Sequence, residues 1–154
     1  MGDKKKLCFA ASSGGHLEQL MMLEPLIEEF DGFIVTEKTQ YDIKMPARCY
    51  YMVQVNRRQK SCLLRMALNS IRAVWILWKE KPDAIVCTGV LAMIPLCLIG
   101  KVCGKKLIYI ESFAKVTSPT LSGKLLYKYA DRFYVQWEQM LKIYPNAIYL
   151  GGIY

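Results

Sequence analysis

The sequence has 154 residues, 53% of them apolar, and its 21 lysines and arginines outnumber 13 acidic residues, which gives a net charge of +8. Such a chain buries enough apolar surface to fold as one domain over residues 1–154, so intrinsic disorder is excluded. The positive charge indicates an anionic partner, such as a phosphorylated ligand or an acidic membrane surface. The basic residues are dispersed and no nucleic-acid-binding motif accompanies them, so we do not expect nucleic acid as a partner.

Short apolar runs alternate along the chain with segments of helical periodicity. The runs predict strands at residues 6–11, 32–37, 50–55, 84–88, 106–111, 132–137 and 147–150. The periodic segments predict helices at residues 17–30, 60–79, 91–103 and 122–130. Because strands that alternate with helices form right-handed βαβ units, the sequence predicts an α/β fold. We expect a Rossmann-like parallel sheet with helices on both faces.

The cellular compartment is indicated by the lack of a membrane-spanning segment and by the pattern of the cysteines. It contains no window of about 18 uninterrupted apolar residues, so no helix is expected to span a membrane. Its six cysteines form no C-x-x-C pair and several lie in apolar runs, as reduced core cysteines do. With one histidine in the chain, a zinc site is not expected, and no other metal or cofactor is predicted. We therefore expect a cytoplasmic protein.

The first predicted strand is followed by the turn Ser12, Ser13, Gly14 and Gly15. A glycine-rich turn before a helix lets backbone N–H groups face an anion, at the edge where open α/β sheets bind ligands. The glycines suit an ordinary tight turn equally well. No dinucleotide fingerprint is present, but Glu37, at the end of the second strand, occupies the place of a ribose-binding acid. A stand-alone dinucleotide-binding oxidoreductase is therefore the alternative interpretation.

Two titratable residues are predicted at the same edge. His16 begins the first helix, where the helix dipole favours a neutral imidazole that could act as a base. Glu111 ends the strand at 106–111 and could orient a sugar hydroxyl, act as a base, or simply begin the next segment. Gly89 and Ser112 follow strands at this edge and complete the predicted acceptor site.

The predicted helix at 60–79 has more apolar residues than one sheet face can cover. Basic flanks with tryptophans are typical of an anionic membrane interface, although burial against a partner protein explains the pattern equally well. The predicted membrane contacts are Arg57, Arg58, Arg65, Arg72, Trp75 and Trp78.

Four segments in order resemble one known family: residues 12–18 (SSGGHLE), 82–89 (PDAIVCTG), 111–114 (ESFA) and 123–137 (GKLLYKYADRFYVQW). The chain resembles the acceptor-side subunit of split GT-B glycosyltransferases over essentially its whole length. One member type anchors the N-acetylglucosaminyltransferase of dolichol-linked oligosaccharide synthesis to the membrane. Bacterial counterparts serve capsule and exopolysaccharide assembly, and the single motifs are also similar to the N-terminal half of the murein-precursor N-acetylglucosaminyltransferase.

The resemblance implies half of a GT-B fold, acting as the accessory subunit of an inverting galactosyl- or N-acetylglucosaminyltransferase. A separate catalytic subunit would bind the UDP-sugar, so this chain needs no cofactor of its own. This chain would present a lipid-diphosphate-linked acceptor, with Gly14 and Gly15 on its phosphate and His16 or Glu111 as the base. A pure scaffold without any catalytic residue is a further alternative.

The resemblance also implies where the complex works. The chain would recruit the catalytic subunit to the inner face of the cell membrane. The membrane helix that precedes the eukaryotic form is missing before Lys4, so the attachment is expected to be peripheral. The segment 147–154 is rich in strand-forming residues, and Ile153 and Tyr154 are the kinds of side chain that anchor interfaces. We predict that they dock the catalytic subunit, the alternative being that the segment only completes the sheet.

Overall fold

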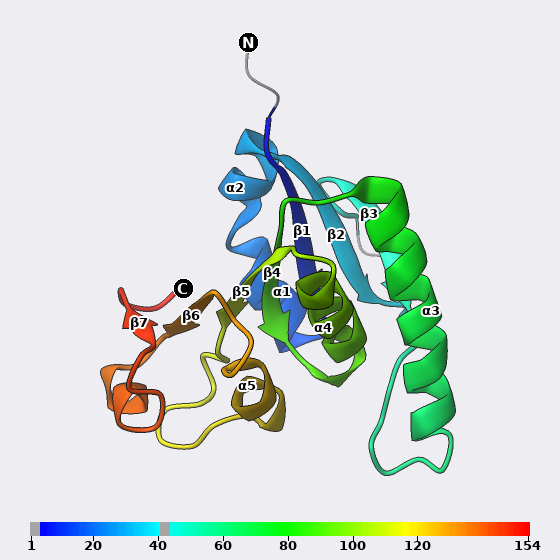
Figure 1. The fold of residues 1–154 in the computed structure, drawn as a ribbon. Coiled ribbons are helices and arrows are strands. Elements are labelled where there is room, and N and C mark those ends of the chain that lie inside the picture. The colour runs from blue at the N-terminus through cyan, green and yellow to red at the C-terminus, as the bar shows by residue number, and fades with distance from the viewer. Residues whose placement is uncertain (1–3, 41–43) are drawn as a thin grey trace.

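A computed structural model of the protein describes residues 4–40 and 44–154. Its seven strands form one sheet, in which every neighbouring pair is parallel (Figure 1). The spatial order is β3-β2-β1-β4-β5-β6-β7. The strands are β1 Lys6–Ala11, β2 Asp31–Glu37, β3 Arg48–Met52, β4 Ala84–Gly89, β5 Lys106–Ile110, β6 Arg132–Val135 and β7 Ile148–Tyr149. The predicted parallel α/β sheet is confirmed, with a strand at each expected place.

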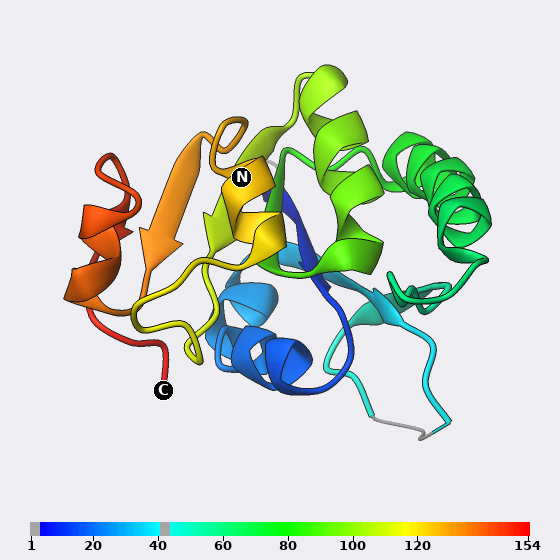
Figure 2. The ribbon, with the colours of Figure 1, turned by 90° about the horizontal axis from the view of Figure 1, so that it is seen from below.

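Helices cover both faces of this sheet, as predicted (Figure 2). The α-helices are α1 Gly15–Met21, α2 Glu24–Glu29, α3 Cys62–Glu80, α4 Ile94–Val102 and α5 Leu121–Leu126, with 3₁₀ helices η1 Leu91–Met93 and η2 Glu138–Lys142. One core layer lies under α1 and α2, and a larger one lies under α3, α4 and α5. Central strand β4 is buried along its whole length, which explains its continuous apolar sequence.

Two predicted helices are interrupted at a proline. The segment 17–30 divides into α1 and α2, and the segment 91–103 divides into η1 and α4. Pro25 and Pro95 each lie in the first turn of the second part. Proline lacks the amide hydrogen that a helix interior needs but is well suited to a first turn, so each proline restarts the helix.

The third strand lies earlier than predicted, at Arg48–Met52 rather than 50–55. The side chain of Asn69 on α3 explains the difference. Its amide donates to Val53 O and its oxygen accepts from Val53 N, both at 2.8 Å. Because this side chain occupies both backbone groups of Val53, the chain leaves the sheet there.

The order of the strands places a switch point between β1 and β4. The chain moves outward from β1 to β3 and then crosses back to lay β4 against the other side of β1. The loops after β1 and β4 therefore leave the sheet in opposite directions, and open α/β sheets bind ligands in the crevice so formed. Here the two loops are joined, since Ser12 N donates to Gly89 O at 2.8 Å and Val90 N donates to Ser12 Oγ at 3.0 Å.

Asp131, just before β6, gives the fold a defined response to acid. Lys101 Nζ donates to Asp131 Oδ2 at 2.6 Å and Leu107 N donates at 2.8 Å, which together lower the pKa of Asp131 from 3.8 to about 2. A lowered pKa means that the stabilisation is complete above about pH 4 and is lost as the pH falls toward 2. We expect Asp131→Asn to lower the free energy of unfolding by about 1–2 kcal/mol at pH 7.

The measurement is urea unfolding of both proteins at pH 7 and at pH 2.5. The difference between them should shrink at the lower pH, because Asp131 is then protonated in the unfolded chain and most of its stabilising effect is lost. An equal difference at both pH values would contradict a charge-dependent role.

Candidate functional site

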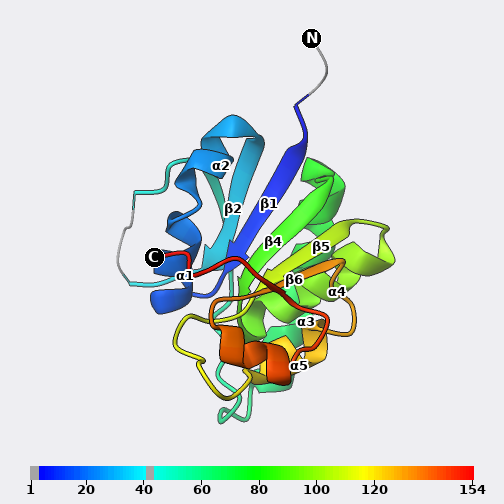
Figure 3. The same ribbon diagram turned by 90° about the vertical axis from the view of Figure 1, so that its left-hand side faces the viewer.

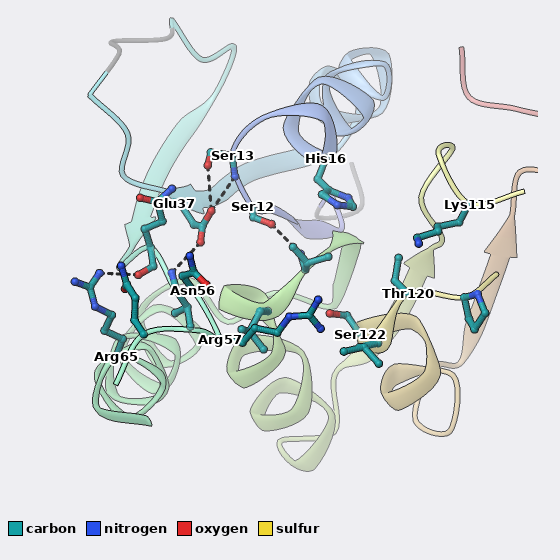
Figure 4. Close-up of a pocket in the computed structure, with 17 residues that line it drawn as sticks. Ser12, Ser13, His16, Glu37, Asn56, Arg57, Arg65, Lys115, Thr120 and Ser122 are labelled. Atoms are coloured by element: carbon teal, nitrogen blue, oxygen red, sulfur yellow. Dashed lines mark hydrogen bonds between the residues drawn. The ribbon is translucent and has the colours of Figure 1, made fainter. Parts of the chain in front are cut away.

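A cavity of about 660 Å³ opens at the switch point, where the carboxyl ends of the strands meet (Figure 4). The loops that follow β1, β3, β4 and β5 all contribute to it, and so does Glu37, the last residue of β2. Its polar and charged lining includes Ser12, Ser13, His16, Glu37, Asn56, Arg57, Arg65, Lys115, Thr120 and Ser122. The sequence-predicted residues Ser12, Ser13 and His16 are thus brought together at one concave site.

His16 is held in place by hydrogen bonds to Thr88 of β4. Its Nδ1 lies 2.8 Å from Thr88 O, and Thr88 Oγ1 donates back to His16 O at 2.7 Å. A carbonyl oxygen can only accept, so Nδ1 carries the ring hydrogen in the neutral imidazole. Nε2 then keeps its lone pair, and the side chain faces the cavity (Figure 4). The geometry therefore suits proton removal from a hydroxyl bound in the cavity.

Gly89 packs directly against this histidine. Its φ is 112°, which side chains rarely adopt, and a Cβ at this position would lie 3.2 Å from His16 Nδ1. Gly89 was predicted as part of the acceptor site, but it does not line the cavity, and what it contributes there is close packing against His16. Ser112 is not among the residues that line the cavity, and its amide donates to Glu111 Oε1 at 2.9 Å.

Glu37, at the end of β2, holds the glycine-rich turn in place. Ser13 donates to Glu37 Oε2 from its amide at 3.2 Å and from its hydroxyl at 3.1 Å, and Val55 N donates to Oε1 at 3.1 Å. Both carboxylate oxygens are thus occupied within the chain, which argues against the ribose-binding role in the oxidoreductase alternative. Gly14 and Gly15 are exposed next to the cavity but do not line it.

Glu111 was predicted at the ligand-binding edge, but it does not line the cavity. It is 1% exposed, and its carboxylate accepts hydrogen bonds from the amides of Ser112 and Thr120 and from the hydroxyls of Thr120 and Tyr144. Burial and this neighbouring carboxylate raise the pKa of Tyr144, which keeps its hydroxyl a donor. A carboxylate surrounded by four donors and absent from the cavity wall is suited to hold the segment 112–120 in place. Of the two residues predicted as candidate bases, His16 is the one that lines the cavity.

The outward face of α3 is apolar and exposed. Five residues spaced three or four apart form one continuous row, here named the α3 stripe: Leu64, Leu68, Ile71, Trp75 and Trp78. Ile71 is 68% exposed and Trp78 is 73% exposed. Among the residues that the structure describes, no helix is both long and apolar enough to cross a membrane.

The predicted basic membrane contacts are only partly on this surface. Arg57 and Arg65 line the cavity instead. Arg65 donates to Ser61 Oγ and Gln54 O, and Arg72 donates to Tyr51 O at 2.9 Å. Arg58 is exposed and follows Arg57 in the loop between β3 and α3.

The C-terminal segment folds back on its own chain. After β7 it runs across the face of the sheet that carries α1 and α2 (Figure 3). Ile153 packs into the core layer of that face and its amide donates to Gln136 Oε1 at 2.9 Å. The ring of Tyr154 lies 4.9 Å from that of Phe113, with 59% of the residue exposed. Ile153 is therefore less free to meet a partner than predicted, whereas Tyr154 remains accessible.

Beside this segment lies an apolar groove of about 870 Å³. It is formed by strands β1, β4, β5 and β6, by α2 and by the C-terminal segment. Leu26 of α2, Ile108 and Ile110 of β5, and Leu150 and Ile153 of the C-terminal segment are among its lining residues. This part of the sheet is the least covered by helices.

Sequence reasoning missed Lys115 and Thr120 and placed Arg57 at the membrane. A signal for the first two was present, since both follow a strand that ends at the ligand-binding edge. Thr120 also shows the N-cap pattern, because its hydroxyl accepts from Gly123 N at the start of α5. Within residues 4–40 and 44–154, no three His, Cys, Asp or Glu side chains come together as metal ligands.

Comparison with solved structures identifies the fold. MurG from Acinetobacter baumannii superposes with a TM-score of 0.71 at 14% identity, over 88% of this chain and 42% of that one. UDP-N-acetylglucosamine 2-epimerase from Rickettsia bellii superposes with a TM-score of 0.75 at 13% identity, over 97% and 45% of the two chains. The protein therefore has the Rossmann-like fold of one half of GT-B proteins, and it spans less than half of either structure.

Sequence comparison identifies the family. The UDP-N-acetylglucosamine transferase subunit ALG14 of Rattus norvegicus is 27% identical over 96% of this chain and 82% of its own length. The subunit of the same name from Yarrowia lipolytica is 30% identical over 95% of this chain and 80% of its own length. A family model described as "Oligosaccharide biosynthesis protein Alg14 like" matches residues 7–153. The chain belongs to this Alg14-like family.

Proposed function

We propose that the protein is the acceptor-side accessory subunit of a two-chain UDP-N-acetylglucosamine transferase, which it recruits to the membrane. The observation that carries this proposal is the family match over residues 7–153, together with relatives named as subunits of that transferase. A fold that corresponds to half of a GT-B protein supports it, since the proposal assigns donor binding to a separate catalytic chain. The names of these relatives favour N-acetylglucosamine over galactose, and a role in capsular polysaccharide assembly stays a prediction.

The acceptor in this proposal is a sugar linked to a lipid diphosphate. It enters the cavity at the switch point, and His16 Nε2 removes the proton from its reacting hydroxyl. The oxygen attacks the anomeric carbon of the donor in line with the leaving UDP, which inverts the configuration at that carbon. The exposed amides of Gly14 and Gly15 stay candidates for a phosphate contact at the cavity rim.

The α3 stripe is the proposed membrane contact. Exposed apolar patches of this extent mark interaction surfaces, and two of its five residues are tryptophans, which favour the membrane–water interface. Arg58 and Lys60 precede the helix, and Lys79 and Lys81 lie at its other end. Cations at both ends of an apolar row complement an anionic bilayer surface, to which each contributes about 1 kcal/mol. The protein would then lie peripherally on the cytoplasmic face of the membrane.

The catalytic subunit would dock at the opposite side of the sheet. The apolar groove beside the C-terminal segment offers a surface there, and Tyr154 and Leu150 are exposed at its border. Aromatic and aliphatic side chains of this kind anchor interfaces. This arrangement leaves the α3 stripe free for the bilayer.

Recruitment is tested by floating the catalytic subunit of the same organism with vesicles of zwitterionic and anionic phospholipid. We expect that subunit to float only when this chain is present. Ile71→Glu should weaken flotation of both chains by about tenfold or more, because it replaces apolar contact with a charge at the bilayer. Met22→Glu is the matched control, since Met22 is half exposed on the opposite face and should change flotation little.

Flotation of the catalytic subunit without this chain would contradict the recruiting role. Unchanged flotation of the Ile71→Glu protein would show that α3 is not the membrane contact.

A further inference from the structure

Arg57 and Lys115 enter the cavity from separate loops, whereas Arg65, the third cation of its wall, donates to Ser61 Oγ and Gln54 O. Arg57 lies in the segment between β3 and α3, and Lys115 lies in the segment between β5 and α5. The guanidinium of Arg57 reaches toward Ser122, whereas Lys115 points inward from the side of Thr120 (Figure 4). Lys115 is partly buried. The fold therefore brings two positive charges to one hollow from distant parts of the chain.

Within the described part of the chain, these two charges are not neutralised. Among residues 4–40 and 44–154, neither Arg57 nor Lys115 forms an ion pair. Glu37 is the acidic residue of the described cavity wall, and its oxygens are already occupied by Ser13 and Val55. Uncompensated cations in a concave site attract an anion, and two of them suit an anion with two charged groups.

We propose that Arg57 and Lys115 clamp the diphosphate of the lipid-linked acceptor, one cation on each phosphate. This assignment rests on the proposed function and gives it a binding site for the charged part of the substrate. The hydroxyls of Thr120 and Ser122 line the same wall and can donate to phosphate oxygens. Since His16 lines the same cavity, a diphosphate held here leaves the attached sugar within the hollow that contains the base.

The surroundings favour a lipid diphosphate over the diphosphate of a nucleotide. Arg57 and Arg65 place the cavity at the N-terminal end of α3. Leu63 and Leu64, in the first turn of that helix, are 84% and 65% exposed. A lipid chain leaving the cavity at this side meets apolar side chains that continue into the α3 stripe. The polar ribose and base of a nucleotide would gain nothing from the same contacts.

Calorimetric titration of the full chain tests the clamp with three probes: geranyl diphosphate, inorganic pyrophosphate and UDP-N-acetylglucosamine. We expect geranyl diphosphate to bind more tightly than the other two. Arg57→Gln and Lys115→Gln should each weaken binding of geranyl diphosphate and of pyrophosphate by about tenfold or more, the usual effect of losing a hydrogen bond to a charged group. Arg132→Gln and Lys142→Gln are the controls, because each removes the same charge from an exposed residue outside the cavity wall.

Binding unaffected by Arg57→Gln and Lys115→Gln would overturn the clamp. So would UDP-N-acetylglucosamine that binds as tightly as geranyl diphosphate and depends on the same two residues, because the clamp would then hold the nucleotide. None of these titrations involves the catalytic subunit. Lost recruitment with intact diphosphate binding would therefore count against the proposed function alone, and the reverse pattern would count against the clamp alone.

Discussion

Replacing His16 with alanine should lower sugar transfer by the reconstituted two-chain complex by about 10²–10⁴-fold, the usual contribution of a general base. The reason is geometric. Thr88 O accepts the hydrogen on Nδ1 and so leaves Nε2 as the proton acceptor inside the cavity. The measurement is initial-rate transfer from UDP-N-acetylglucosamine to a lipid-diphosphate-linked sugar. Melting temperatures of both proteins would show that the fold is retained.

The matched variant is His16→Asn. The asparagine amide can replace Nδ1 as the donor to Thr88 O but supplies no group in the place of Nε2. A histidine that only ties the turn to β4 would be rescued by asparagine, whereas a base would not. Activity of His16→Asn within a few-fold of the unmodified complex would support the scaffold alternative, in which this chain has no catalytic residue.

Glu111→Ala should destabilise the protein severely, by about 3 kcal/mol or more of a domain's typical 5–15 kcal/mol. The substitution removes the acceptor for four hydrogen bonds at a position that is 1% exposed. The hydroxyl of Tyr144 and the amide of Thr120 would then be buried without this partner. Urea unfolding measures the loss, and Glu28→Ala on the exposed side of α2 is a control that should change stability little.

The same experiment separates the structural role of Glu111 from the catalytic one that the sequence suggested. A protein with Glu111→Ala that folds as stably as the unmodified chain but loses transfer activity would restore Glu111 as the base. Gly123→Ala offers a second variant, because a Cβ there would lie within van der Waals overlap of Glu111 and 2.8 Å from the hydroxyl of Tyr144. We expect it to destabilise the protein through the same cluster.

The strands could be predicted from the sequence because each is a short apolar run that ends at a turn. The central strands are buried on both faces, so their sequences are almost continuously apolar and their positions are close to those expected. The end of β3 could not be predicted, because Asn69 lies on a helix well along the chain and its bonds to Val53 exist only in the folded protein. Pro25 signals the division of the first helix, but the helical periodicity of residues 17–30 continues through it and hides the break.

The part of the candidate site that the sequence predicted is the one marked by a local pattern, the glycine-rich turn after β1. The turn with Ser12, Ser13 and His16 lies at the cavity because any loop after β1 reaches the switch point. The sequence placed Glu111 at the cavity because a carboxylate at a strand end looks the same whether it faces the cavity or points inward to Tyr144 and Thr120. Arg57 was assigned to the membrane because it shares the basic composition of α3, whereas its place in the cavity depends on the loop conformation.

The most direct test of the central claim is transfer by each chain alone and by the pair, with UDP-N-acetylglucosamine and a lipid-diphosphate-linked sugar in vesicles. The account predicts no turnover by this chain alone, because it assigns donor binding to a separate catalytic subunit, as the names of the relatives suggest. The pair should be active, and the catalytic subunit alone should be inactive on acceptor in vesicles. Turnover by this chain alone, or equal turnover by the catalytic subunit without it, would contradict the account.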